Sequence, residues 1–131
     1  MKNQERIEAI IAKYPRLFPN GRPRCGFEVS NGWLSLIENL CSICVHHLEH
    51  AKNLVEDPDY PIQIAQIKEK FGTLRCYWDG STSYINGATN LAEQMSGTIC
   101  EDCGNPGTTS GTGAAEGWLR TLCETCREDK K

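Results

Sequence analysis

Two pairs of cysteines constrain the fold of this 131-residue chain more than any other feature. Each pair encloses two residues, in Cys100-Glu101-Asp102-Cys103 and Cys123-Glu124-Thr125-Cys126, and 19 residues separate the inner cysteines. A CxxC segment can place two sulfur atoms on one tight turn, and two such turns supply four thiolates to one tetrahedral ion. The spacing therefore predicts one structural Zn²⁺, with no coordination position open to a substrate or a catalytic water.

The residues around the cysteines agree with this prediction. Gly104 follows Cys103 at a position where a metal-binding turn needs a residue that tolerates positive φ. Residues 118–122 form a strand-like run that leads into the second pair, and we expect Trp118 to pack against the metal lobe. The eight cysteines also permit disulfides, but a bridge within one CxxC closes a very small loop and is typically redox-active. The pattern therefore favours zinc.

The order of turn, Trp-bearing strand and second turn at a helix start resembles a treble-clef or zinc-ribbon finger over about residues 98–128. The cysteine spacing is similar to that of GATA-type fingers and Arf GTPase-activating domains. Only five residues follow Cys126, too few for the long helix of those families, so we do not expect their activities here. The segments QIKEKFGTLR (66–75) and LAEQMS (91–96), ahead of CEDCG, resemble small phage and bacterial zinc-finger proteins usually labelled uncharacterised. That resemblance implies a setting and not a mechanism.

Hydrophobic periodicity predicts an α+β fold with a long central helix, a β-hairpin and a further helix, followed by a C-terminal four-cysteine zinc finger. A short helix covers about residues 3–14, and residues 25–29 are extended. The long helix begins at Ser30 or Asn31 and ends at about Glu56, before Asp57-Pro58. Its apolar stripe comprises Trp33, Ile37, Leu40, Cys44, His47, Ala51 and Val55.

The second half of the pattern begins with strands at residues 62–67 and 73–78, joined by a longer loop over residues 68–72. A helix capped by residues 81–83 follows, and residues 108–115 read as a flexible loop. The expected buried stripe of this helix comprises Tyr84, Ala88, Leu91, Ala92 and Met95. We therefore expect an α+β domain over residues 1–97 and a zinc-finger lobe packed on it over residues 98–131.

Composition limits the function classes. The hydrophobic fraction is 39%, so the core is modest, and structural zinc could offset this with an apparent contribution of about 10–16 kcal/mol. No apolar run approaches the ~18 residues of a membrane span, and the amino terminus lacks the apolar stretch of a secretory signal. Free thiols in a metal cage require a reducing compartment, so we expect a cytoplasmic protein. The net charge of −3 argues against a generally nucleic-acid-binding surface.

Two further groups of metal-ligating residues lie in the predicted central helix. Cys44 and His47 share the apolar stripe, and with Cys25, Cys41 and Cys76 a second metal site is conceivable. We favour the alternative that these cysteines are small buried hydrophobes.

The segment His46-His47-Leu48-Glu49-His50 also fits the H-x-x-E-H pattern of zinc peptidases, with His46, Glu49 and His50 in the functional positions. Those enzymes are far larger, and the same pattern suits a solvated helix edge. We therefore expect no enzyme and no small-molecule substrate, and a metal-dependent hydrolase is the least favoured interpretation.

The predicted hairpin tip combines the aromatic ring of Phe71 with the positive charges of Lys68, Lys70 and Arg75. Such a tip could contact a nucleic acid or another partner, whereas an exposed turn with one packed ring is the simpler interpretation. We expect a zinc-stabilised module that recognises a macromolecule, with a protein as the favoured partner, in the manner of a phage-type inhibitor of a host complex. The alternative is a nucleic-acid-binding zinc finger.

Overall fold

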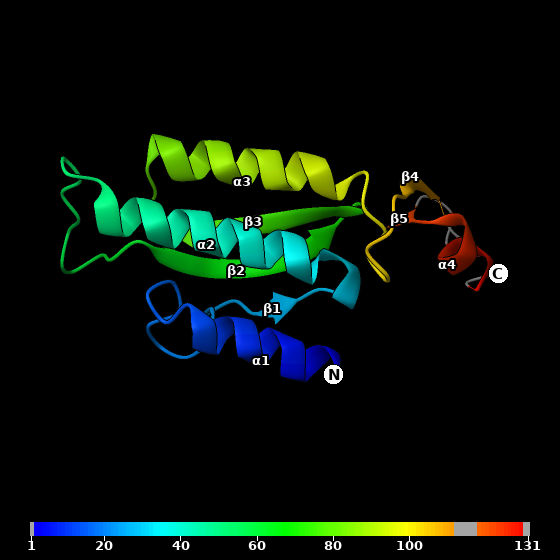
Figure 1. Ribbon diagram of the computed structural model, residues 1–131, viewed down its shortest axis with the longest axis horizontal. Helices are drawn as coiled ribbons and strands as arrows, with labels where there is room; N and C mark the ends of the chain where they lie inside the picture. Colours follow the sequence, from blue (N-terminus) through cyan, green and yellow to red (C-terminus); the bar gives the residue numbers. More distant parts are fainter. Residues whose placement is uncertain (1, 112–117, 130–131) are drawn as a thin grey trace.

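The computed structural model describes residues 2–111 and 118–129, which form the predicted α+β fold. The body, residues 2–97, contains a three-stranded sheet and three α-helices, and residues 98–129 form a smaller cysteine lobe beside it (Figure 1). The elements are α1 Asn3–Lys13, β1 Phe27–Glu28, the 3₁₀ turn η1 Asn31–Trp33, α2 Leu34–His50, β2 Gln63–Lys70, β3 Thr73–Asp79, α3 Ser83–Ser96, β4 Thr108–Gly111, β5 Leu119–Leu122 and α4 Glu124–Glu128.

The sheet has the order β1-β2-β3, with β1 parallel and β3 antiparallel to β2. The outer edge of β3 is covered by α3. Ser96 Oγ accepts a hydrogen bond from the backbone N–H of Leu74 at 2.8 Å, and Glu93 Oε2 accepts one from the N–H of Cys76 at 3.0 Å. Two polar side chains thus accept hydrogen bonds from backbone N–H groups of the edge strand that would otherwise be free to pair with another strand.

The hairpin is tighter than predicted. Strand β2 continues to Lys70, so the expected loop over residues 68–72 is wrong and the turn contains only Phe71 and Gly72. Both residues have positive φ, 54° and 81°. Two-residue hairpins favour such turns because their twist matches that of the strands. Positive φ is uncommon for a residue as bulky as phenylalanine.

The core lies between the sheet and the helices, and it confirms the first half of the stripe predicted for α2. Trp33 and Cys44 are fully buried and Ile37 and Leu40 nearly so. The second half is wrong, because α2 ends at His50 and Val55 is 93% exposed. The Glu56 carboxylate accepts hydrogen bonds from Arg16 and from the backbone N–H of Ile62. These contacts hold residues 51–61 as a link between α2 and β2.

The buried face of helix α3 overlaps the predicted stripe only in part: Ala92 is buried as predicted and Ala88 packs against the core, but the rest of the stripe is wrong. Thr82 caps it as expected, through a hydrogen bond from the N–H of Ile85 at 3.1 Å. The buried side chains are Ile85, Thr89, Ala92 and Ser96, whereas Tyr84, Leu91 and Met95 are 46%, 61% and 43% exposed. Thr89 accepts a hydrogen bond from the indole of Trp78, and Ser96 closes the sheet edge, so polar partners select this face.

The cysteine lobe contains a two-stranded antiparallel sheet of β4 and β5, followed by α4. Residues 108–111 therefore form a strand and not part of the expected loop over residues 108–115, whose last four residues lie outside the described part of the chain. Strand β5 confirms the strand expected before the second cysteine pair. Within the residues described, no helix combines the length and apolar character needed to cross a membrane.

Candidate metal centre

The four C-terminal cysteines converge on one point. The sulfur atoms of Cys100, Cys103, Cys123 and Cys126 all lie within 4.8 Å of one another. Cys103 Sγ and Cys123 Sγ are 3.6 Å apart. A tetrahedral site with Zn–S bonds of ~2.3 Å has sulfur–sulfur edges of about 3.8 Å. The sulfur positions therefore fit a tetrahedral metal ion.

The first cysteine pair lies on a tight turn that is closed by backbone hydrogen bonds. The N–H of Gly104 donates to the carbonyl of Cys100 at 2.9 Å, and Gly104 adopts the expected positive φ of 87°. The N–H of Asn105 points at Cys103 Sγ from 3.5 Å. An N–H group directed at sulfur stabilises a thiolate, and hence a metal–thiolate bond.

The second pair lies where β5 meets α4. Cys123 occupies the N-cap position of α4, and its sulfur accepts a hydrogen bond from the N–H of Cys126 at 3.4 Å. Cys126 lies in the first turn of this helix, which ends at Glu128. The sequence prediction that the second pair begins a short helix is confirmed.

The acidity of one of the four thiols, that of Cys100, also suits metal binding. Burial raises the pKa of Cys100, but backbone N–H groups of Cys123, Cys103 and Asp102 outweigh it and lower this pKa to about 7. A hydrogen bond with the side chain of Cys123 raises the pKa of Cys126, and charge repulsion from the Cys100 thiolate raises it further. A divalent cation removes that repulsion, since metal binding displaces the thiol protons.

Residues other than the cysteines fix the lobe internally, and no sequence pattern indicated them. Glu101 is only 5% exposed. Its carboxylate accepts hydrogen bonds from Arg120 Nε at 2.8 Å and from the N–H of Thr121 at 3.1 Å. Arg120 also donates to Asp102 at 2.9 Å. This network ties the first cysteine turn to β5.

Hydrogen bonds between residues distant in the sequence join the lobe to the body. The N–H of Gly32 donates to the carbonyl of Glu101 at 2.8 Å, and the indole of Trp33 donates to the carbonyl of Ile99 at 2.8 Å. The hydroxyl of Thr121 donates to the carbonyl of Gly72, in the hairpin turn, at 2.6 Å. A Cβ atom at Gly32 would lie 2.0 Å from the carbonyl oxygen of Cys100, so only glycine permits this approach.

The four remaining cysteines do not come together as a second metal site. Cys41, Cys44 and Cys76 are buried in the body core, as predicted for small hydrophobes, whereas this prediction is wrong for Cys25, which is exposed. Burial raises the pKa of Cys44 to about 12 and also raises those of Cys41 and Cys76. In the described part of the chain, only the four C-terminal cysteines bring three or more potential metal donors together.

The histidines at the end of α2 have other contacts. The rings of His46 and His50 stack at 4.2 Å between centroids. No third donor joins them among the residues described. His47 hydrogen-bonds with the hydroxyl of Thr82 at 2.9 Å and stacks on Tyr84.

The hairpin residues lie beside the lobe. Phe71 is 64% exposed, with Lys70 Nζ 5.6 Å from its ring centroid. Trp118 is 58% exposed, so the prediction that it packs against the metal lobe as a core residue is wrong, and Leu119 is 37% exposed. These residues line one hollow of about 290 Å³. We call Phe71, Trp118 and Leu119 the aromatic patch.

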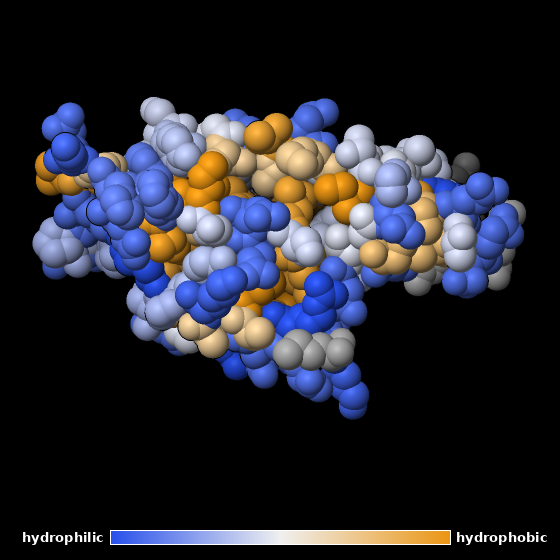
Figure 2. Space-filling model, in the orientation of Figure 1, coloured by the Kyte–Doolittle hydropathy of each residue, from blue (hydrophilic) through white to orange (hydrophobic). Residues whose placement is uncertain are grey.

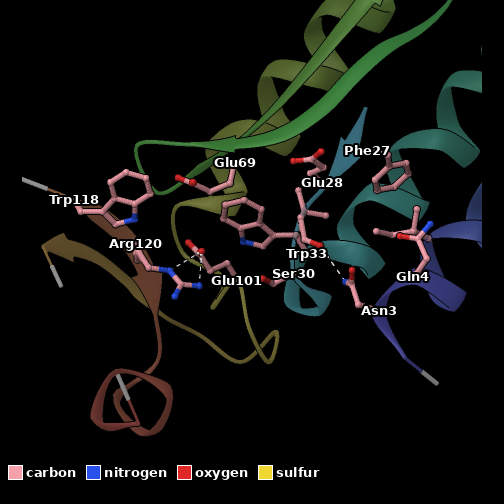
Figure 3. A pocket seen from close by; sticks show the side chains of 12 residues that line it. Asn3, Gln4, Phe27, Glu28, Ser30, Trp33, Glu69, Glu101, Trp118 and Arg120 are labelled. Atoms are coloured by element: carbon pink, nitrogen blue, oxygen red, sulfur yellow. Dashed lines mark hydrogen bonds and ion pairs between the residues drawn. The ribbon is translucent and has the colours of Figure 1, made fainter. Parts of the chain in front are cut away.

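A second hollow, of about 450 Å³, adjoins the first hollow and shares Trp118 and Glu69 with it. Figure 3 shows Trp118 and Arg120 at one end, Phe27 and Gln4 at the other, and the buried ring of Trp33 between them. The patch therefore continues into a groove between the lobe and the body that is lined by both polar and apolar side chains.

Lys68 and Arg75 are paired across β2 and β3, on the side of the sheet opposite the buried side chains of Leu74 and Cys76. Lys70 lies on the same side as Lys68 by strand alternation. The structure thus brings the three predicted basic residues to one face of the hairpin.

Comparison with protein-family models, with curated proteins and with solved structures gives no match. The site is therefore interpreted from its geometry.

Proposed function

We propose that this chain is a zinc-stabilised binding module, in which one Zn²⁺ fixes a surface that recognises a protein partner. The observation that carries the proposal is the convergence of four cysteine sulfurs within 4.8 Å. Zn²⁺ suits four thiolates in tetrahedral geometry, and such a site supplies folding energy because all four positions belong to the protein. The sequence of cysteine turn, hairpin, cysteine turn and helix supports a treble-clef type of finger. A reducing compartment such as the cytoplasm would keep the thiols available.

The position of the ion explains how it would support binding. Trp118 and Leu119 precede the ligand Cys123 by five and four residues, and β5 connects them. Thr121, on the same strand, hydrogen-bonds to the turn that carries Phe71. Ligation of Cys123 therefore fixes the spacing of Trp118 and Phe71. We infer that the aromatic patch is assembled only when the metal is bound.

The chemistry of the patch favours a protein partner. Exposed aromatic rings around an apolar hollow are typical of the residues that dominate the energy of protein–protein binding. Phe71 holds an uncommon backbone conformation and still presents its ring to solvent, which supports a role in recognition. Inhibition of a host complex by a phage-type protein is a narrower form of the proposal and rests on the sequence resemblance alone. The proposal assigns no catalytic residue.

Nucleic-acid binding is a second candidate, favoured by the basic face of the hairpin. None of the ion pairs among the described residues involves Lys68, Lys70 or Arg75. Tyr77, 44% exposed, follows Arg75 by two residues on the same side of β3 and could stack on a base.

The test begins with metal analysis of protein purified under reducing conditions, where we expect one zinc per chain. Capture experiments from the native host then compare wild type with Phe71→Ser and Trp118→Ser. Val55→Ser is the matched control, since Val55 is exposed and lies outside the patch. A partner retained by wild type and by the control but lost by both patch variants supports the proposal. Equal capture by all four proteins contradicts it.

A salt titration separates the two candidates. Affinity for single-stranded oligonucleotides that falls steeply with salt, and that is lost in Lys68→Ala and Arg75→Ala, would favour the nucleic-acid function. Absence of binding at low salt would exclude it.

A further inference from the structure

Helices α2 and α3 leave an apolar groove between them on the surface of the body. It has a volume of about 350 Å³ and is lined chiefly by Leu36 and Ile43 from α2 and by Ala88, Leu91 and Met95 from α3. Ile43, Leu91 and Met95 are 44%, 61% and 43% exposed. Figure 2 shows hydrophobic side chains gathered over these two helices. We call this surface the α2–α3 groove.

The two helices that form the groove run antiparallel (Figure 1) and carry rows of side chains with the same spacing. Tyr84, Ala88, Leu91 and Met95 follow one another at spacings of four, three and four residues, and so do Leu36, Leu40, Ile43 and His47. This is the spacing with which helices pack in bundles. The first row contains four of the five residues that the sequence predicts to be buried; the fifth, Ala92, is buried in the body, and Ala88 packs against the body core.

Charged side chains point away from the groove. Glu93 is the sole charged residue of α3, and its carboxylate binds the N–H of Cys76 at the sheet edge. Glu38 of α2 pairs with Lys13 of α1 at 2.6 Å. The groove is bordered instead by uncharged residues such as Asn39. Charge depletion at the centre of a surface is characteristic of protein interfaces.

Gly87 is a second, independent indication of contact. It lies inside α3, where glycine is less favourable than alanine, and no positive φ requires it. A Cβ atom built there meets nothing within 4 Å, so packing inside this chain does not require glycine either. Gly87 adjoins Ala88, a groove residue. Close approach of another backbone would account for the missing side chain.

From these observations we propose that the α2–α3 groove binds a second copy of the same chain, so that two helix pairs form a symmetric four-helix arrangement. A second copy supplies an equally uncharged surface. The protruding side chains of Leu91 and Met95 of each copy can then fill the groove of the other copy. A two-fold interface of this kind is self-complementary. The groove does not involve the cysteine lobe, so this inference stands independently of the proposed function.

The test measures the mass of the full-length, metal-loaded protein by analytical ultracentrifugation over a wide concentration range. We expect a concentration-dependent dimer. Leu91→Glu should raise the dimer dissociation constant at least tenfold, by about 1.4 kcal/mol or more, because it places a charge in the interface. Val55→Glu introduces the same charge at an exposed residue outside the groove and should leave the dimer intact. Leu91→Gln serves where the glutamate variant does not fold.

Gly87→Ala should change monomer stability and dimer affinity in opposite directions, which is not expected for a helix face that is exposed only to solvent. It should raise the thermal midpoint of the dilute monomer through helix propensity and yet weaken the dimer. Mixing Leu91→Glu with Leu91→Lys should restore association, since opposite charges then meet across the interface. A wild-type chain that stays monomeric throughout overturns the proposal, as do equal effects of Leu91→Glu and Val55→Glu. Occupation of the groove of a monomeric chain by a helix from another protein overturns it as well.

Discussion

The body and the cysteine lobe are held together by different forces. The body buries large apolar side chains completely, including Trp33, Leu34, Ile37, Leu74 and Ile85. Among the described residues of the lobe, the buried ones are Cys100, Glu101, Thr121 and Leu122, which include one large hydrophobic side chain. A segment of fewer than ~40 residues rarely has enough core to fold without a metal, disulfides or association. The body can therefore depend on the hydrophobic effect, whereas the lobe depends on polar contacts and on its thiols.

The largest test of this difference removes a metal ligand. Cys123→Ser should abolish zinc binding and unfold the lobe, because structural zinc contributes about 10–16 kcal/mol in comparable small sites. Metal analysis and limited proteolysis, with cleavage expected after Arg120 and Arg127, measure the result. Cys25→Ser is the matched control, since Cys25 is exposed and lies outside the cluster. Full zinc content in Cys123→Ser would refute the four-thiolate site.

A core substitution in the body should destabilise the body and leave zinc binding by the lobe unchanged. Leu74 is fully buried, so Leu74→Ala should lower the free energy of unfolding of the body by about 2–5 kcal/mol through lost burial and cavity formation. Denaturant unfolding followed by far-UV circular dichroism measures the change. Zinc content should stay at one per chain, and loss of zinc in this variant would show that the two regions are not separable.

A smaller effect is expected from the network that ties the first cysteine turn to β5. Glu101→Gln removes the charge that faces Arg120 while retaining the shape of the side chain, and should cost about 1–3 kcal/mol. The zinc affinity of this variant, measured by chelator competition, should also fall. Asp102→Asn, at the other acceptor of Arg120, should cost less because Asp102 is more exposed. The reverse order would place the main contact of Arg120 at Asp102.

The smallest effect concerns an exposed ion pair in the body. A hydrogen bond from Arg24 lowers the pKa of Asp79 below its ordinary value of 3.8. The folded-state pKa is thus the lower one, so the stabilisation is present above pH ~4 and is lost as the pH falls through the lowered pKa. The difference in thermal midpoint between wild type and Asp79→Asn should be small at neutral pH and should vanish in acid. A difference in thermal midpoint that grows as the pH falls would contradict a lowered pKa of Asp79 in the folded state.

The sequence predicted those parts of the molecule that depend on local pattern. The cysteine spacing, Gly104 and the strand before Cys123 indicated the metal centre, and periodicity indicated the helices and the hairpin. The predictions were wrong where contacts between residues distant in the sequence determine the end of a helix or its buried face. Glu56 binds Arg16 and the backbone of Ile62, which shortens α2, and polar partners from β3 choose the buried face of α3. Glu101 and Gly32 carry no sequence signal, because their importance lies in the approach of the lobe to the body.

The most direct test of the account is hydrogen–deuterium exchange of the wild-type chain with zinc bound and after chelation under reducing conditions. We predict that chelation removes protection from β4, β5 and α4, while α2, β2 and β3 remain protected. Protection that is unchanged in the lobe after the metal is removed, or lost equally in the lobe and the body, would contradict the claim that a metal ion holds the lobe and a hydrophobic core holds the body.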